Sequence, residues 1–401
     1  MITRIPASPA PTRARSRDGR AGRTAMLGRL VARDTWQAAT RGRRLRADVW
    51  DAALDESVAW LARSHEATGR RGSARGYSLL FGWQPAFPET TGYIIGTLLA
   101  YAIPRGRDDL VEHAREMADW EIEVQGEDGG LMQGLIDQHP RRSIVFNTGM
   151  VLHGWLDIAG ALGEARHLEA ARRAGDFLVR TQEPDGSWRG AVTHRGIPHT
   201  YKSRVCWAML RLAEATGEDS YRESAVRGLD WVVAQQGADG WFENCVFEPG
   251  TVPNTHGIAY TLRGLLESHA LVGEERWLDA AVRGSRPLIE RQAAGRALVA
   301  RWDRGWRPSA RSECLTGTAQ LGGVWLRVHE IAGVEGFRAA GLAAVEHAAS
   351  HQLRTSWPGL RGALPGSFPV YGRYAPLACP NWAAKFLADA LMVRDRVLEA
   401  G

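Results

Sequence analysis

Lysine is almost absent from the chain, which has 48 arginines but only two lysines, Lys202 and Lys385. A sequence that uses arginine wherever a surface cation suffices keeps lysine where arginine cannot act, because a buried lysine can lose its proton and serve as a base. Cysteine is also scarce, and the four cysteines form no CxxC pair and no disulfide-like spacing. We therefore expect both lysines in a functional site, and a cytoplasmic, reducing location.

The chain also lacks an apolar run of the roughly 18 residues that a transmembrane helix needs. Its start has no apolar core of the kind that a secretory signal contains. Residues 1–46 hold twelve arginines against Asp18 and Asp34, which leaves the remainder slightly acidic. The basic pI therefore belongs to the start of the chain, and nucleic acid is not an expected partner.

The first 45 residues are rich in Pro, Arg and Ser, a composition that predicts a disordered tail. It is interpreted as a solvated extension, as residues upstream of a true start at Met26 in place of Met1, or as an arm that makes weak contact with a membrane surface or a partner. Residues 46–401 are expected to form a single domain.

A helical repeat organises this domain. Short polar turns such as GEAR and GEDS are each followed by an amphipathic segment that ends near a glutamine: Gln125, Gln182, Gln236, Gln292 and Gln352. Each glutamine leads into a loop rich in Gly and Trp. A second helix, apolar on most sides and therefore buried, then begins near 88, 147, 199, 254, 316 and 380. Six outer and six inner helices predict an all-α (α/α)6 toroid, because no polar end caps of an open solenoid are present.

The loops from outer to inner helices are long, and all of them fall on one face of the ring. The six inner helices point their N-termini, which carry partial positive charge, at the same face. This geometry predicts a central site that favours an anionic ligand.

Candidate site residues are those in, or just before, the first turns of the inner helices. Those assigned to catalysis are Glu89, Lys202, His256, Tyr260, Glu313 and Lys385. Those assigned to substrate binding are Trp83, Tyr93, Asn147, His153, Tyr201, Trp241, Asn254, Gln320, Asn381 and Trp382. Capping is an equal reading for Asn147, Asn254 and Asn381, and a hydrogen-bonded core position is the alternative for His153.

No metal or other cofactor is expected. Cys314, Cys379 and His256 could make a Cys2His zinc site like that of the lanthipeptide cyclases, but Pro380 stands where that family has a zinc-binding histidine. Small buried cysteines are the preferred interpretation.

Two resemblances add to this reading. The segment QEPDGSW at 182–188 is similar to the repeat of squalene cyclases and protein prenyltransferases, which implies the toroid; the DxDD motif of the protonating cyclases is absent. The segments at 83–99, 313–333 and 360–391 resemble the VpsJ-type proteins of exopolysaccharide and capsule biosynthesis. That resemblance implies a role in polysaccharide biosynthesis.

Three functions remain open. The first is an enzyme that modifies or cleaves an acidic glycan in a cleft lined by tryptophans, as a lyase, an epimerase or a hydrolase; Glu89 and Glu313 are the best carboxyl pair for hydrolysis. The second is an isoprenoid cyclase-like enzyme or a binder of lipid-linked intermediates. The third is a glycan-binding assembly protein without catalysis.

Overall fold

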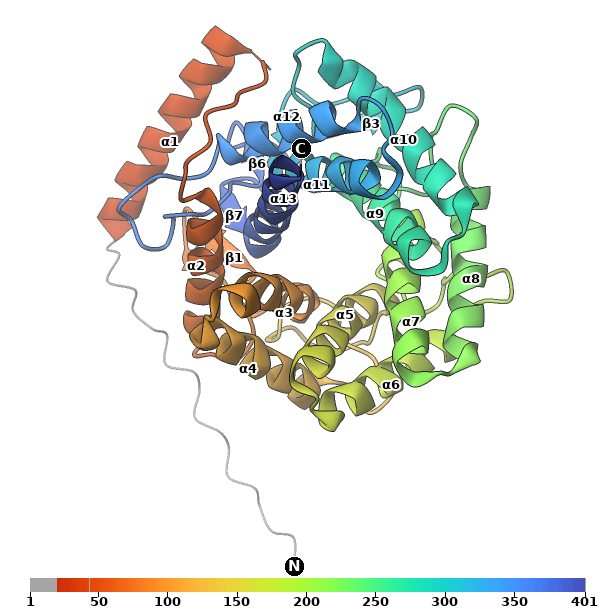
Figure 1. Cartoon of the computed structure of the whole chain (residues 1–401). Helices are drawn as coiled ribbons and strands as arrows, with labels where there is room; N and C mark the ends of the chain where they lie inside the picture. The colour runs from red at the N-terminus through yellow and green to blue at the C-terminus, as the bar shows by residue number, and fades with distance from the viewer. Residues whose placement is uncertain (1–19, 43, 401) are drawn as a thin grey trace, which may run out of the picture.

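Twelve helices form two concentric rings in a computed structural model that describes residues 20–42 and 44–400 (Figure 1). The inner ring consists of α3 (Pro88–Ala102), α5 (Val145–Leu162), α7 (Ser203–Thr216), α9 (Thr255–Val272), α11 (Leu315–Ala332) and α13 (Asn381–Glu399). The outer ring consists of α2 (Ala53–Glu66), α4 (Asp108–Val124), α6 (Ala165–Arg180), α8 (Asp219–Ala234), α10 (Glu275–Ala293) and α12 (Phe337–Ala349). The predicted (α/α)6 toroid is therefore confirmed.

The inner helices begin within a few residues of their predicted starts. The third is preceded by a 3-10 turn, Thr200–Lys202, so that α7 itself starts at Ser203. Asn254 caps α9 by accepting a hydrogen bond from the Gly257 N–H, as the capping interpretation expects. Asn147 does not cap, because it lies inside α5 and donates to the Met132 carbonyl.

A glutamine recurs at the end of five of the six outer helices, α2 being the exception, and joins neighbouring hairpins. The Gln182 side-chain amide donates both to the Gly186 carbonyl in its own loop and to the Ser224 carbonyl of the next outer helix. Gln125 and Gln236 repeat this arrangement. Gln352 donates to the Ala53 carbonyl of the first outer helix, and this contact between the last and first hairpins closes the ring.

The inner helices approach closely because small residues stand at their crossings. A Cβ at Gly154 of α5 would lie 2.1 Å from the Gly92 carbonyl oxygen of α3, and a Cβ at Gly92 would lie 2.4 Å from the Val151 Cα. Any larger residue would force the two backbones apart.

Short strands tie the long loops together on the face where the inner helices begin. One sheet has the order β2 (Gly82–Trp83), β1 (Gly76–Ser78) and β7 (Ala378–Pro380), all antiparallel, with Tyr77 opposite Cys379. This sheet joins the loops before the first and last inner helices. Two further antiparallel pairs are β3 (Trp302–Asp303) with β4 (Arg307–Pro308), and β5 (Glu313–Cys314) with β6 (Ser367–Phe368).

The start of the chain differs from the prediction of a disordered tail. Residues 1–19 lie outside the described residues, but α1 (Arg20–Arg41) is a helix that lies beside the double ring (Figure 1). Leu30 is buried against the ring, and the buried Asp34 accepts a hydrogen bond from the Val370 N–H at 2.8 Å. Apolar residues spaced by three and four positions on one helix face explain the order, and the tail's average composition hides that pattern. No helix in the described part of the chain is long and apolar enough to cross a membrane.

Candidate active site

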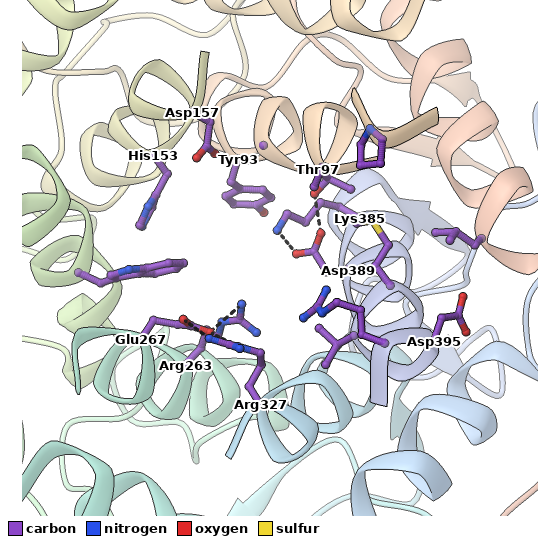
Figure 2. A pocket seen from close by; sticks show the side chains of 18 of the residues that line it. Tyr93, Thr97, His153, Asp157, Arg263, Glu267, Arg327, Lys385, Asp389 and Asp395 are labelled. Atoms are coloured by element: carbon purple, nitrogen blue, oxygen red, sulfur yellow. Dashed lines mark hydrogen bonds and ion pairs between the residues drawn. The ribbon is translucent and has the colours of Figure 1, made fainter. Parts of the chain in front are cut away.

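An axial cavity of about 750 Å³ runs along the inside of the inner ring. All six inner helices contribute to its wall, and the residues range from Tyr93 and Arg204 near helix starts to Arg105 and Glu399 near helix ends. Figure 2 shows Tyr93, Glu267 and Lys385 around this cavity. Its lining thus extends toward the C-terminal ends of the inner helices. We expected the site at their N-terminal ends, where the long loops lie.

Aromatic side chains fill the ring near the helix N-termini and explain this difference. Tyr260 contacts the rings of Phe146, Phe247, His256 and Phe386 at centroid distances of 4.1–6.5 Å. Such edge and tilted contacts pack densely. The aromatic residues therefore form the floor of the axial cavity.

The cavity is rich in charge. Its cationic lining residues are Arg105, Arg204, Arg211, Arg263, Arg327, Lys385 and Arg396, and its acidic ones are Asp157, Glu267, Asp389, Asp395 and Glu399. Cations outnumber acids by two. Since the cavity faces the negative ends of the helix dipoles, these side chains, and not the dipoles, supply its positive potential.

Arg204 is the buried cation of this lining that lacks an acidic partner within the described chain. It lies in the first turn of α7 and is 3% exposed, yet its guanidinium forms no ion pair or hydrogen bond with any residue that the structure describes. Aromatic rings surround it, with centroids 4.9 Å away in Tyr260 and 5.6 Å away in Tyr93. Burial lowers its pKa, but a guanidinium keeps its charge in proteins. A buried, uncompensated cation favours binding of an anion.

Lys385 and Asp389 form an ion pair one turn apart on α13 (Figure 2). The Thr97 hydroxyl of α3 donates to the second oxygen of Asp389 at 2.7 Å. Burial alone would raise the pKa of Asp389, but Lys385 and Thr97 hold it below its ordinary value. The Lys385 ammonium also lies 5.3 Å from the centroid of the Tyr93 ring, so these two proton-carrying groups adjoin in the cavity.

Asp157 is the acidic residue on the other side of α3 from Asp389. Asp157 of α5 pairs with Arg211 of α7 at 2.6 Å. Arg211 also donates to Nδ1 of His153, and Nε2 of His153 donates to the Arg204 carbonyl. Burial, with the positive charge of the two arginines, holds the pKa of His153 well below its ordinary value. His153 is therefore a neutral support for both arginines.

Glu267 of α9 binds two further cations, Arg263 at 2.9 Å and Arg327 at 3.2 Å. Burial would raise its pKa, yet these arginines lower it below the ordinary value. Arg327 also pairs with Glu330 at 2.8 Å, so both arginines have acidic partners. Within the described part of the chain, Arg204 is therefore the one buried cation of the cavity wall without an acidic partner, and it is free to bind a ligand.

On the far side of the aromatic floor, Glu89 and Lys202 are two neighbouring residues with strongly shifted pKa values. Burial raises the pKa of Glu89 to about 7 and lowers that of Lys202 to about 7, and the charge of each opposes the shift of the other. Lys202 is 3% exposed and packs over the Tyr201 ring at 4.9 Å, whereas Glu89 is partly exposed. Burial lowers the pKa of the nearby His256 to about 3.

Most of the residues selected from the sequence are connected through this floor. Tyr93, His153 and Lys385 line the axial cavity, and Gln320 lines an adjoining cavity of about 50 Å³. The Tyr93 hydroxyl lies 3.3 Å from that of Tyr260, which stacks against His256. Burial, Glu89 and Tyr260 raise the pKa of Tyr201, and Lys202 in turn acts on the pKa of Glu89. These three residues are thus linked electrostatically to Tyr260.

Other selected residues lie outside the cavity. Glu313 is buried and pairs with His347 of α12 at 2.7 Å, so the expected Glu89–Glu313 pair does not form there. Trp83 packs on Trp60, and Trp241 packs on Trp306. Asn381 donates to the Ala74 carbonyl, and Trp382 donates to the Tyr374 hydroxyl. The tryptophan that lines the cavity is Trp207, so the wall is cationic more than aromatic.

The sequence did not lead us to four charged residues of the cavity wall: Asp157, Arg204, Glu267 and Asp389. A signal was available, because each is a charged residue on a helix that is otherwise apolar on most sides. Such residues are buried with a partner or at a site.

Two groups of side chains have the spacing of metal ligands. Asp119 and Glu164 form ion pairs with arginines, and the His167 ring lies 2.9 Å from Asp119. Glu313, His347 and His351 are buried, but Nδ1 of His347 accepts a hydrogen bond from the Arg46 N–H at 3.1 Å. His347 therefore carries its proton on Nε2, where it donates to Glu313, and this arrangement opposes metal binding. Cys314 caps α11 through a hydrogen bond from the Gly317 N–H and forms no ligand-spaced group with Cys379 and His256 in the described chain.

Known proteins resemble the chain in two ways. Residues 144–245 match the model of the squalene-hopene cyclase C-terminal domain. The squalene–hopene cyclase of Zymomonas mobilis is 28% identical over 152 residues, which cover 35% of this chain and 22% of the cyclase. The match thus spans about a fifth of that relative.

The solved structures that resemble the chain include glycan-acting enzymes. The unsaturated glucuronyl hydrolase of Bacillus sp. GL1 has a TM-score of 0.68 at 16% identity and covers 86% of this chain and 96% of its own. One specific for heparin has a TM-score of 0.68 at 12% identity, covering 86% and 97%. A sugar epimerase from a ruminal bacterium has a TM-score of 0.65 at 12% identity, covering 85% and 97%. The chain shares their (α/α)6 fold.

Proposed function

We propose that the chain is an enzyme that transfers protons on an acidic sugar bound in the axial cavity. The observation that carries this proposal is Arg204, a buried guanidinium on the cavity wall with no acidic partner among the described residues. A sugar carboxylate placed there gains a charge-assisted bond that no protein group competes for.

The remaining groups favour proton transfer over hydrolysis. Glycoside hydrolysis needs a carboxyl group that carries a proton. Asp389 and Glu267 are held ionised by their partners, and Asp157 is in a 2.6 Å ion pair with Arg211. No carboxyl group among these three is thus available as the acid. Burial raises the pKa of Asp395, but this residue follows Lys385 by ten positions on α13, about 15 Å along the helix, and so lies far from the first turn of α13.

Lys385 and Tyr93 are suited to a proton transfer next to the sugar carboxylate. Burial lowers the pKa of Lys385, so its amine loses its proton and becomes available as a base more readily than that of an exposed lysine, whereas Tyr93 keeps its proton because burial raises its pKa. Lys385 removes the proton from the carbon beside the carboxylate, and the electron pair moves into the carboxylate, where Arg204 stabilises the added charge. Return of a proton from Tyr93 to the opposite face inverts the centre, as in an epimerase. If instead the bond to the oxygen substituent on the neighbouring carbon breaks and the departing oxygen takes the proton of Tyr93, the reaction is that of a lyase.

Two comparisons support a glycan substrate. The similar structures include a sugar epimerase and hydrolases of unsaturated glucuronyl units, which shows the fold and favours acidic sugars as ligands. The segments that resemble VpsJ-type proteins suggest exopolysaccharide or capsule biosynthesis as the pathway. An isoprenoid cyclase has the partial sequence match and the aromatic floor in its favour, but Arg204 and Lys385 beside that floor would repel a carbocation.

Solvent exchange tests this proposal. Uronic-acid oligosaccharides are incubated with the protein in D2O, and proton NMR follows the signal beside the carboxylate. We expect deuterium to replace that proton, Lys385→Met to slow the exchange by about a hundredfold or more, and Lys385→Arg, which keeps the charge but not the base, to be as slow. Release of reducing ends without exchange would instead establish a hydrolase, and an unchanged rate in Lys385→Met would refute the assignment of the base.

A further inference from the structure

A second cavity, of about 580 Å³, lies between the N-terminal segment and the ring. One wall is Gly42 and Arg44, in the connection between α1 and α2, and the other includes Arg296 after α10 and Arg311 before β5. It has no lining residue in common with the axial cavity. It is therefore a separate place at which a ligand can bind.

Three arginines without ion-pair partners in the described chain converge on this cavity. Arg44, Arg296 and Arg311 are exposed and come from three different segments. Arg44 and Arg296 stand directly opposite each other in an antiparallel β-bridge, and the neighbouring Leu45 N–H donates to the Gly295 carbonyl at 3.1 Å. Like charges opposite each other across a strand pair are destabilising. An anion between them would relieve the repulsion.

The acidic residue in the cavity wall does not cancel these charges. Glu313 is 1% exposed, and one of its oxygens accepts the Nε2–H of His347 at 2.7 Å. His347 is itself held by the Arg46 N–H, so the carboxylate is engaged with the ring. The cavity thus presents three guanidinium groups against one carboxylate that is already hydrogen-bonded.

We propose that this cavity binds a phosphate group. A phosphate presents three acceptor oxygens and up to two negative charges, which matches several guanidinium forks better than the two oxygens of a carboxylate do. Because one wall belongs to the connection after α1, the bound phosphate also ties the N-terminal segment to the ring. The phosphate can belong to a soluble diphosphate or to a lipid headgroup, and the two sources are separable by experiment.

Calorimetry with inorganic pyrophosphate and the full chain tests the soluble source. Arg296→Ala and Arg311→Ala are compared with Arg222→Ala, an exposed arginine of α8 that has no ion pair in the described structure. Loss of one charged contact is expected to weaken binding by about tenfold, whereas Arg222→Ala should bind as the wild type does. All three residues are exposed, so Arg311→Ala and Arg222→Ala should unfold at the wild-type temperature, and Arg296→Ala at that temperature or slightly above it because the repulsion with Arg44 is removed. A loss of affinity then cannot come from misfolding.

Flotation with phosphatidylcholine vesicles that contain phosphatidic acid tests the lipid source, with vesicles of phosphatidylcholine alone as the control. Binding in either assay that is lost in Arg296→Ala and Arg311→Ala supports the proposal and identifies the source. Absence of binding in both assays, or binding that these variants leave intact, overturns it. Neither result depends on the chemistry of the axial cavity, because the two cavities have no lining residue in common.

Discussion

The hydroxyl oxygens of Tyr93 and Tyr260 lie 3.3 Å apart at the centre of the ring. Tyr93 lines the axial cavity, whereas Tyr260 packs against His256 on the other side of the floor. This contact joins α3 to α9, which stand across the ring from each other (Figure 1). It is therefore the link between the cavity and the buried group around Glu89.

Replacement of either tyrosine by phenylalanine should destabilise the fold modestly. Each change removes one hydroxyl and leaves its partner unpaired in the core, at a cost of about 1–3 kcal/mol. The double variant should lose less than the sum of the two single changes, because no partner is then left unpaired. Chemical denaturation of the four proteins measures this coupling, and strict additivity would show that the two hydroxyls do not interact.

Asp389→Asn should destabilise the protein more strongly than an exposed change would. It leaves the Lys385 ammonium without its counter-ion, and because the Asp389 side chain is 26% exposed we expect a cost of about 1–3 kcal/mol, less than breaking a fully buried pair would cost. The double variant Lys385→Met, Asp389→Leu removes both charges and should recover much of the loss. Equal stability of wild type and Asp389→Asn in urea would argue against a buried ion pair.

Glu89 should make stability depend on pH. Its pKa is about 7 when folded and 4.5 as the unperturbed value, so the native state holds a proton that the unfolded state loses between these values. The free energy of unfolding should thus fall as the pH rises from 4.5 to 7, by up to about 3 kcal/mol from this group. Glu89→Gln should lack this component; identical pH profiles for the two proteins would refute the raised pKa.

Gly92→Ala should disrupt the contact between α3 and α5. Its Cβ would lie 2.4 Å from the Val151 Cα, a backbone atom that cannot move aside alone, so we expect a loss of about 1–3 kcal/mol. Gly28→Ala in α1 is the matched control, because its Cβ meets nothing within 4 Å and the change should stabilise the helix slightly. Thermal unfolding compares the two, and an equal effect would contradict the close packing.

The fold could be predicted because its determinants are local and repeated. Glutamines such as Gln182 recur at one position in five of the six hairpins, and their hydrogen bonds to the next hairpin explain why the repeat closes. The helix α1 was missed because its apolar stripe, which includes Leu30, is short and lies among many arginines.

The candidate site could be predicted only in part. The choice of Lys385, Tyr93 and His153 followed from their positions on inner helices, and all three line the axial cavity. Which end of the ring stays open depends on how aromatic side chains from six helices fill the axis, and one helix cannot reveal this. Arg204 lacks an acidic partner because Asp157, Glu267 and Asp389 are paired with other cations. These pairings form only when the ring is assembled.

The central claim is that a sugar carboxylate binds to Arg204 in the axial cavity. A crystal structure of the protein with a glucuronate-containing disaccharide tests it most directly. The account predicts density for the uronate between Arg204, Lys385 and Tyr93, and loss of that density in Arg204→Gln crystals grown in the same way. A disaccharide bound elsewhere, or bound in the cavity with its carboxylate turned away from Arg204, would contradict it.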